Sequence, residues 1–320
     1  MNILIADSFP DTHRLELENL GHRVTMNPAL DEHTLTGAIG DHDILVVRST
    51  RVNAATLDAG TGLRLVVRAG AGTNTIDCAR AASRGIRVCN VPGANALAVA
   101  ELVLGLIICI DRNLADNVAD LRNGIWNKKK YSKSRGLCGQ KLGILGMGAI
   151  GLAVAERARA FGMQVFAVHR DGRGRATAAR MSAAGITELE SQEALLEECD
   201  IVTIHLPATE KTRGMVNGDF LARMKPGAML INSSRGELVD EAALLHAIET
   251  RGIRAGLDVY HNEPAGGEGD FESAIARHPA VCGTHHIGAS TAQAQTAVAD
   301  GVVAIIQAFE NGEVRNCVNA

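Results

Sequence analysis

Three polar stretches contain residue types that could work together chemically. Arg235 follows a short apolar run, Glu263 stands before Pro264, and His286 precedes the turn at Gly288. An arginine can bind a carboxylate through two parallel hydrogen bonds. A histidine can exchange a proton near neutral pH, and a neighbouring glutamate favours the imidazolium and orients it. Singly, each is more often a surface charge, a turn or a structural histidine. Together they suit hydride transfer between a 2-hydroxy acid and a 2-oxo acid, with the hydride carried by a nicotinamide cofactor.

A glycine pattern supplies the expected place for that cofactor. Gly146, Gly148 and Gly151 follow the apolar run Leu142–Leu145, and the amphipathic segment Ala149–Phe161 leads on to a second apolar run. In this strand–turn–helix order the first glycine permits the tight turn and the second lets a pyrophosphate approach the backbone. The third lets the helix pack against the strand. The helix N-terminus offers free N–H groups to the diphosphate, so the stretch predicts dinucleotide binding.

The type of dinucleotide depends on the end of the second apolar run. His169 and Arg170 stand there, where NAD binding favours a carboxylate for the ribose 2′-hydroxyl. An arginine attracts the 2′-phosphate of NADP, which favours NADP. Asp171 could still reach back to a ribose, so both NAD and NADP remain open.

Alternating apolar runs and amphipathic segments predict an α/β protein with two doubly wound parallel sheets. We expect a flavodoxin-like substrate-binding domain from residues 1–97 and 291–320, with a Rossmann dinucleotide-binding domain, 98–290, inserted in it. One long helix, Ala94–Trp126, would lead into the second domain, and the helix Thr291–Glu310 would return to the first. Ligands of such sheets bind beyond the carboxyl ends of the strands.

Composition narrows the class of protein further. The chain has 320 residues, 46% of them apolar, and a net charge of −4 from 32 basic and 36 acidic residues, with 3% aromatic residues. This balance disfavours a general nucleic-acid binder. The seven scattered cysteines predict reduced thiols and no metal site. The N-terminus does not read as a signal peptide, and the run Ala96–Ile110 is too short to span a bilayer, so we expect a cytoplasmic protein that binds no membrane.

Motifs spread over nearly the whole chain point to one family. They are Val47-Arg48-Ser49-Thr50, Arg68-Ala69-Gly70-Ala71-Gly72-Thr73-Asn74, Asn90-Val91-Pro92-Gly93-Ala94-Asn95, Gly146–Gly151, Ser234-Arg235-Gly236, Asp258–Pro264 and His286-Ile287-Gly288-Ala289-Ser290-Thr291. In these motifs the chain resembles the D-isomer-specific 2-hydroxyacid dehydrogenase family. The resemblance implies an NAD(P)-dependent oxidoreductase acting on the CH–OH group of a D-2-hydroxy acid.

The resemblance also implies roles for residues. Arg235, Glu263 and His286 would be the catalytic set. His285 replaces the proline usual before the catalytic histidine and competes for its role, and the spacing to Gly288 favours His286. The implied cofactor-binding residues, with Asp258 near the nicotinamide carboxamide, are Gly146, Gly148, Ala149, Ile150, Gly151, His169, Arg170, His205, Leu206, Pro207, Thr212, Ser233, Ser234, Asp258 and Gly288. The implied substrate-binding residues are Arg48, Arg68, Gly70, Ala71, Gly72 and Asn95.

The expected substrate is 3-phosphoglycerate or a similar anionic 2-hydroxy acid. Arg48 and Arg68 match positions that meet a substrate phosphate in those members of the family that act on a phosphorylated acid, and the run Lys128–Arg135 is also basic. A sulfonate or a second carboxylate would fit the same charge. A homodimer is expected, with the helix Ala96–Ile110 at its interface. Since the chain stops at Ala320, no serine-sensing regulatory domain and no feedback inhibition by serine are expected.

Two other functions stay open at this point. One is an NADPH-dependent glyoxylate/hydroxypyruvate reductase, which the pair His169-Arg170 favours. The other is a cofactor-sensing binding protein similar to transcriptional corepressors on the same fold. The intact set of Arg235, Glu263 and His286 counts against this second alternative.

Overall fold

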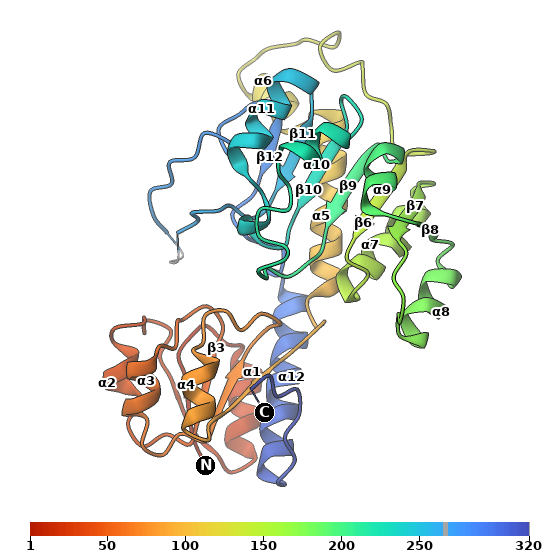
Figure 1. Ribbon diagram of the computed structural model, residues 1–320. Helices are drawn as coiled ribbons and strands as arrows, with labels where there is room; N and C mark the ends of the chain where they lie inside the picture. Colours follow the sequence, from red (N-terminus) through yellow and green to blue (C-terminus); the bar gives the residue numbers. More distant parts are fainter. Residues whose placement is uncertain (265–267, 320) are drawn as a thin grey trace. The chain divides into compact units, whose positions relative to one another are not determined.

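The computed structural model describes residues 1–264 and 268–319, and the chain divides into two compact units (Figure 1). Unit 1 comprises Met1–Asn95 and Ser290–Ala320, and unit 2 comprises Ala96–Ala289. The domain boundaries expected from the sequence are 97/98 and 290/291, close to these. Each unit is a parallel α/β sheet, so the predicted fold class is confirmed.

Unit 1 is built on a five-stranded sheet in the order β2-β1-β3-β4-β5, with every pair parallel. This is the flavodoxin-like order. The strands are β1 (Asn2–Ile5), β2 (Arg23–Met26), β3 (Ile44–Val47), β4 (Leu65–Arg68) and β5 (Arg87–Asn90). The helices are α1 (Asp11–Asn19), α2 (Leu35–Ala38), α3 (Ala54–Ala59), α4 (Cys78–Ser83) and α12 (Ala292–Glu310).

The alternation of side chains along the strands makes two cores in unit 1. Ile3 and Ile5 pack with the buried residues of α12, whereas Leu4, between them, packs with Leu35 of α2 and Leu57 of α3. Successive side chains of a strand point to opposite faces, so one strand serves both layers. Thr291 caps α12 by accepting a hydrogen bond from the N–H of Ala294, which confirms the start predicted for this helix.

Unit 2 is built on a seven-stranded parallel sheet in the order β12-β11-β10-β9-β6-β7-β8. The order reverses between β6 and β9, which is the topological switch point of a Rossmann fold. The strands are β6 (Lys141–Leu145), β7 (Gln164–Val168), β8 (Thr187–Leu189), β9 (Ile201–Ile204), β10 (Met229–Asn232), β11 (Arg254–Leu257) and β12 (Val281–Gly283).

Helices cover both faces of this sheet. The residues of α5 (Ala96–Arg112) and α7 (Ala149–Ala160) form one core with the sheet, and those of α9 (Gln192–Glu198), α10 (Gly218–Arg223) and α11 (Glu241–Arg251) form the other. The remaining helical segments are α6 (Leu114–Arg122), α8 (Arg175–Ala183) and the 3-10 turn η1 (Gly236–Leu238).

The single helix predicted over 94–126 is wrong. Asn113 adopts a left-handed conformation, with φ of 48°, and ends α5 before α6 begins. Asparagine tolerates this conformation better than most residues, but the amphipathic pattern continues across it. Most apolar residues of α5 are buried against the sheet of their own unit, whereas Leu97 is 43% exposed. The subunit interface expected at Ala96–Ile110 stays a prediction. None of the described helices is long and apolar enough to cross a membrane.

Candidate active site

The structure brings His286 and Glu263 into direct contact at the carboxyl edge of the unit 2 sheet. His286 follows β12, Glu263 follows β11, and their side chains meet with Nδ1 2.6 Å from Oε1. His285 has no side-chain hydrogen bond within the residues that the structure describes. Of the two adjacent histidines, His286 alone has the carboxylate partner that orients an imidazole.

Asp258 fixes the loop that carries His286. One of its oxygens, Oδ1, accepts hydrogen bonds from the Thr284 hydroxyl at 2.6 Å and the Ile287 N–H at 2.8 Å. The other, Oδ2, accepts from the Gly288 N–H at 2.9 Å. The carboxylate is 1% exposed. His286 itself holds a left-handed φ of 50°, which costs energy for a residue with a Cβ, and its N–H donates to the Asp258 carbonyl at 2.7 Å.

Arg235 sits in a turn braced by a buried asparagine. Asn232, at the end of β10, donates from its amide to the Arg235 carbonyl at 2.9 Å and accepts from the Ser234 N–H at 3.1 Å. The Ser234 hydroxyl donates to the Ile204 carbonyl at 2.6 Å, which ties the turn to β9. The turn is therefore fixed from two neighbouring strands.

The charge of Arg235 acts on Glu263. Burial alone would raise the pKa of Glu263, but the hydrogen bond and charge of His286, the Tyr260 N–H and the charge of Arg235 together hold that pKa below its ordinary value. Glu263 is thus an anion beside the imidazole at neutral pH. Arg235, Glu263 and His286, which the sequence grouped as one set, lie together in unit 2.

The glycine turn has the shape that a diphosphate needs. A Cβ at Gly146 would lie 2.3 Å from the His205 carbonyl oxygen, and a Cβ at Gly151 would lie 2.0 Å from the Gly146 carbonyl oxygen. A Cβ at Gly148 would meet no described atom within 4 Å. Two glycines are therefore required for close packing, and the third leaves open space before the N-terminus of α7. The residues present fit the pyrophosphate of a dinucleotide.

Two polar atoms at the ends of β9 and β10 support this fit. The Nδ1 of His205 and the Oγ of Ser233 are buried without a hydrogen-bond partner among the described residues. Burial lowers the pKa of His205 to about 3, so its ring is neutral. Buried polar atoms without partners are rare in folded proteins, and a bound ligand is one way to satisfy them.

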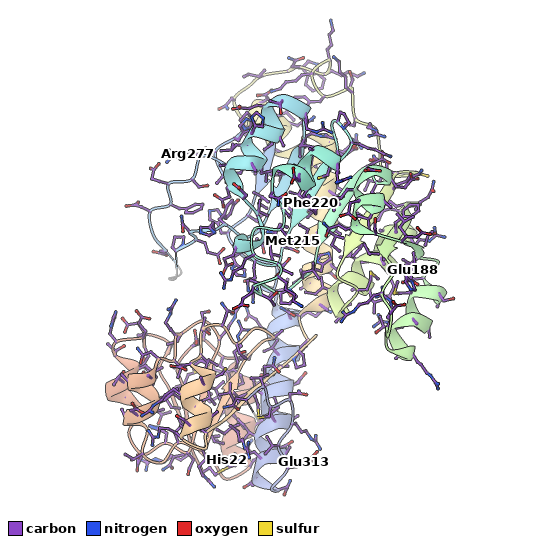
Figure 2. The ribbon with its side chains drawn as sticks, viewed as in Figure 1. His22, Glu188, Met215, Phe220, Arg277 and Glu313 are labelled. Carbon is purple, nitrogen blue, oxygen red and sulfur yellow. The ribbon has the colours of Figure 1, made fainter. Side chains whose placement is uncertain are left out.

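The segment that follows β7 carries both basic and acidic side chains. His169 lies 3.3 Å from Asp171 and 3.7 Å from Glu188, a residue of β8 labelled in Figure 2. Arg173 donates to the Val168 carbonyl and pairs with Glu188 at 3.1 Å. Arg170 is exposed and makes no side-chain hydrogen bond or ion pair with any described residue.

The remaining predicted cofactor residues surround the same sheet edge or brace it. The Thr212 hydroxyl donates to the Pro207 carbonyl at 2.6 Å and accepts from the Thr209 N–H at 2.8 Å, so it folds its own loop. A Cβ at Gly288 would lie 3.0 Å from the carboxylate of Asp258. Ala149 and Ile150 begin α7, and Leu206 follows His205 on the loop after β9.

In unit 1 a carboxylate holds the loop of Arg48. Asp7 Oδ2 accepts hydrogen bonds from the N–H groups of Arg48, Ser49 and Thr50, at 2.6, 3.2 and 3.2 Å. Among the described residues, the Arg48 guanidinium reaches only the Ser290 hydroxyl, at 3.5 Å. The backbone N–H groups of this loop are therefore used within unit 1, whereas the guanidinium remains accessible.

Arg68 and the turn at residues 70–72 lie together in unit 1. A Cβ at Gly70, whose φ is +140°, would overlap the Arg68 guanidinium. The turn is tied to β5, because Asn90 donates to the Ala71 carbonyl at 2.5 Å and the Val91 N–H donates to the Gly70 carbonyl at 2.9 Å. The N–H groups of Ala71 and Gly72 donate no hydrogen bond within the part of the chain that the structure describes. Asn95, also in unit 1, directly precedes α5.

The sequence analysis assigned no role to four residues that shape these sites: Asp7, Asn90, Glu188 and Asn232. Asn232 carried a visible signal, because a polar residue ends an otherwise apolar run. The other three act on residues that are distant in the chain, and their partners become clear only in the folded sheets.

Comparisons with known proteins agree with this geometry. The model of the D-isomer specific 2-hydroxyacid dehydrogenase NAD-binding domain matches residues 104–288. A hydroxypyruvate reductase of Thermotoga maritima is 38% identical over 271 residues, covering 84% of this chain and 85% of that protein. A D-3-phosphoglycerate dehydrogenase of Methanocaldococcus jannaschii is 35% identical over 322 residues and 100% of this chain, which spans only 59% of that relative's length.

A solved structure of a known protein has the same fold. The glyoxylate reductase of Paecilomyes thermophila superposes with a TM-score of 0.86 at 27% identity, covering 99% of this chain and 98% of that one. The family match spans the glycine turn and extends through His286, so it includes the residues described above in unit 2. The chain therefore belongs to the D-isomer specific 2-hydroxyacid dehydrogenase family and is an oxidoreductase of CH–OH groups that works with a nicotinamide cofactor.

Proposed function

We propose that Arg235, Glu263 and His286 are the catalytic residues of this dehydrogenase. The observation that carries the proposal is the 2.6 Å contact between His286 Nδ1 and Glu263 Oε1, with the charge of Arg235 acting on the same carboxylate. Because Nδ1 is occupied, the other ring nitrogen, Nε2, is left for the substrate. It takes the hydroxyl proton when the 2-hydroxy acid is oxidised and returns it when the 2-oxo acid is reduced.

The other two residues support this proton transfer. Glu263 stabilises the imidazolium that forms, and Arg235 binds the substrate carboxylate through its planar guanidinium. When bound, the nicotinamide supplies the hydride transfer. The cofactor-binding set is the glycine turn, the ends of β7, β9 and β10, and the loop at Asp258 and Gly288, all in unit 2. Unit 1 would supply the substrate-binding residues.

The test compares the two adjacent histidines. We expect His286→Ala to lower kcat by about 10²–10⁴-fold, the range of general acid–base catalysis. Dinucleotide binding, followed by nicotinamide fluorescence, should persist. His285→Ala is the matched control and should turn over normally. If the loss falls on His285→Ala instead, the assignment of the acid–base residue is wrong.

The pH dependence tests Glu263. Glu263→Gln keeps a hydrogen-bond partner but removes the negative charge, so the imidazolium is less stable. Reduction needs the protonated ring, and we expect its alkaline limit to move to lower pH. An unchanged pH profile would mean that this carboxylate does not act on the reacting histidine.

For the substrate we propose an anionic 2-hydroxy acid of the 3-phosphoglycerate type. Arg48 is accessible, Arg68 covers the turn at 70–72, and the N–H groups of Ala71 and Gly72, which donate to no described residue, suit a carboxylate. The phosphoglycerate dehydrogenase that matches the whole chain favours the same choice. A second candidate is a hydroxypyruvate reductase, which the 38% identical relative and the pair His169-Arg170 favour.

For the cofactor we propose NADP. Arg170 extends from the end of β7 with no partner among the described residues, and Glu188 is already paired with Arg173. Arg170→Ala should lower kcat/KM for NADPH by about 10–100-fold, because a charge-assisted contact to phosphate is lost, and should change that for NADH little. Arg175→Ala, at an exposed arginine nearby on α8, is the control. Equal effects on both cofactors would reject the proposal.

Steady-state rates with a panel of cofactors and 2-oxo acids distinguish the two candidate substrates. The panel crosses NADH and NADPH with 3-phosphohydroxypyruvate, hydroxypyruvate, glyoxylate, sulfopyruvate and 2-oxoglutarate. Turnover confined to the phosphorylated acid supports the first candidate, and Arg48→Ala should then raise its KM. Fast turnover of hydroxypyruvate and glyoxylate supports the second.

We also propose that a second copy of the chain covers the outer face of α6. The exposed apolar residues there are Leu114, Val118, Leu121, Ile125 and Trp126, the last 81% exposed. Leu114, Val118 and Leu121 recur at helical intervals on α6, and Ile125 and Trp126 follow its C-terminal end. An exposed apolar stripe of this kind is typical of an interface. Light scattering should give a dimer for the native chain and a monomer for Leu121→Asp. A native monomer at micromolar concentration would exclude the proposal.

A further inference from the structure

The turn that carries Glu263 is held by little of its own structure. Glu263 Oε2 accepts a hydrogen bond from the Tyr260 N–H at 3.2 Å, which closes the turn on itself. His261 and Asn262, between them, are exposed. Within the described residues this is the one hydrogen bond that the turn makes to itself, so a contact from another element helps to keep Glu263 in a single position against His286.

That contact comes from the first residue of α11. Glu241 Oε1 accepts a hydrogen bond from the His261 N–H at 2.9 Å. The start of the helix is itself fixed, because Asp240 caps it by accepting from the Ala243 N–H at 3.0 Å. A carboxylate in the first turn is also favoured by the helix dipole. Glu241 therefore presents a charged acceptor from a rigid position.

The same segment touches the turn a second time. A Cβ at Gly236 would lie 2.0 Å from the carbonyl carbon and oxygen of Tyr260 and 2.5 Å from the His261 nitrogen. The backbone after Arg235 is thus packed directly on the backbone before Glu263. The short segment from Arg235 to Glu241 therefore positions the Arg235 guanidinium and also holds the turn that carries Glu263.

Water can compete with Glu241 for the N–H of His261. A cavity of about 410 Å³ lies beside it, lined by Arg213, Glu237, Glu241, His261 and Asn262 among others. An amide that faces such a cavity can bond to water instead, so a neutral or absent acceptor would hold it less firmly. A charged acceptor gives the stronger bond.

We propose that Glu241 is a positioning residue for the reaction, which acts by fixing the Tyr260–Glu263 turn so that Glu263 stays against His286. The inference rests on the proposed roles of Glu263 and His286. Glu241 itself touches neither of those side chains in any described contact. Its removal should therefore affect the proton transfer and leave cofactor and substrate binding largely intact.

The experiment measures kcat, KM and the alkaline pH limit of 2-oxo acid reduction for three variants. Glu241→Ala should lower kcat by about tenfold, a partial loss of general acid–base catalysis, with KM little changed. Its alkaline limit should move to lower pH, in the same direction as in Glu263→Gln. Glu241→Gln retains an acceptor oxygen without the charge and should lose clearly less of kcat than Glu241→Ala. Glu249→Ala, at an exposed glutamate of the same helix, should behave as the native chain.

A double variant separates this inference from the proposed function. Glu241→Ala combined with Glu263→Gln should be no slower than Glu263→Gln alone, because the turn matters only through Glu263. Additive losses, or equal losses in Glu241→Ala and Glu241→Gln, would overturn the positioning role. A slow Glu263→Gln with a native-like Glu241→Ala would reject this inference alone. A native-like Glu263→Gln would reject the catalytic assignment itself.

Discussion

The two units hold a functional loop in the same way, with one aspartate just past the end of a strand. In unit 1, Asp7 accepts three backbone N–H groups from the loop of Arg48. In unit 2, Asp258 accepts two backbone N–H groups and a threonine hydroxyl from the loop of His286. Each carboxylate replaces hydrogen bonds that the sheet no longer provides beyond its edge.

The two loops differ in what they leave free. Asp258 is buried, uses both oxygens, and holds His286 in a left-handed conformation with Glu263 against its ring. Asp7 is half-buried and uses one oxygen toward the described residues, among which the side chain of Arg48 meets only the Ser290 hydroxyl at 3.5 Å. The proton-transfer loop is thus fixed down to the side chain. The loop of Arg48 is fixed in its backbone alone, which allows substrate preference to vary without disturbing the chemistry.

The largest effect is expected where the buried carboxylate is removed. Asp258→Ala would leave two N–H groups and the Thr284 hydroxyl without their acceptor, and we expect a loss of about 3–5 kcal/mol in the free energy of unfolding. Turnover should fall to background, since His286 is no longer held. Urea denaturation measures the first and steady-state rates the second. A loss of stability below about 1 kcal/mol would show that the loop does not depend on Asp258.

A smaller effect is expected at the half-buried carboxylate. Asp7→Ala should lower the free energy of unfolding by about 1–2 kcal/mol, because water can reach the three N–H groups that lose their acceptor. KM for the acid should rise while kcat changes little, since Arg48 moves but His286 does not. Asp11→Ala, which removes an exposed carboxylate paired with Arg14 at the start of α1, is the control for unit 1. If kcat falls as far as in Asp258→Ala, the two loops do not have separate roles.

The architecture could be predicted from the sequence because its signals are local. Apolar runs became the strands of both sheets, and the glycine spacing became the turn from β6 into α7. The failures also have local causes. Asn113 divides a pattern that looks like one helix. No apolar run predicts β8, because it is a three-residue edge strand with no fully buried residue.

The loop contacts could not be predicted, because they depend on the register of parallel strands. Ile5 is paired with Val46, so Asp7 lies level with Arg48, 41 residues away in the chain. Leu257 is likewise paired with Gly283, which brings Asp258 level with Thr284. Residue types show that a carboxylate follows each strand, but the register decides which loop it holds.

The last comparison of the two loops changes one hydroxyl in each. Thr284 donates to the charged Asp258 at 2.6 Å, whereas Thr50, in the loop of Arg48, donates to the neutral carbonyl of Ala6 at 3.2 Å. Valine has nearly the same shape as threonine without the hydroxyl. We expect Thr284→Val to cost about 1.5–3 kcal/mol, the range for bonds to a charged group, and Thr50→Val about 0.5–1.5 kcal/mol.

The same urea titrations measure both valine variants, and the order of the two losses is the informative result. Because each change removes a single donor and leaves the aspartate in place, the comparison isolates the acceptor from the rest of the loop. A larger loss at Thr50 would mean that the charge and burial of Asp258 do not make the His286 loop the more firmly held. In that case the rigidity of the histidine would have to come from its contact with Glu263 and from the turn that Glu241 holds.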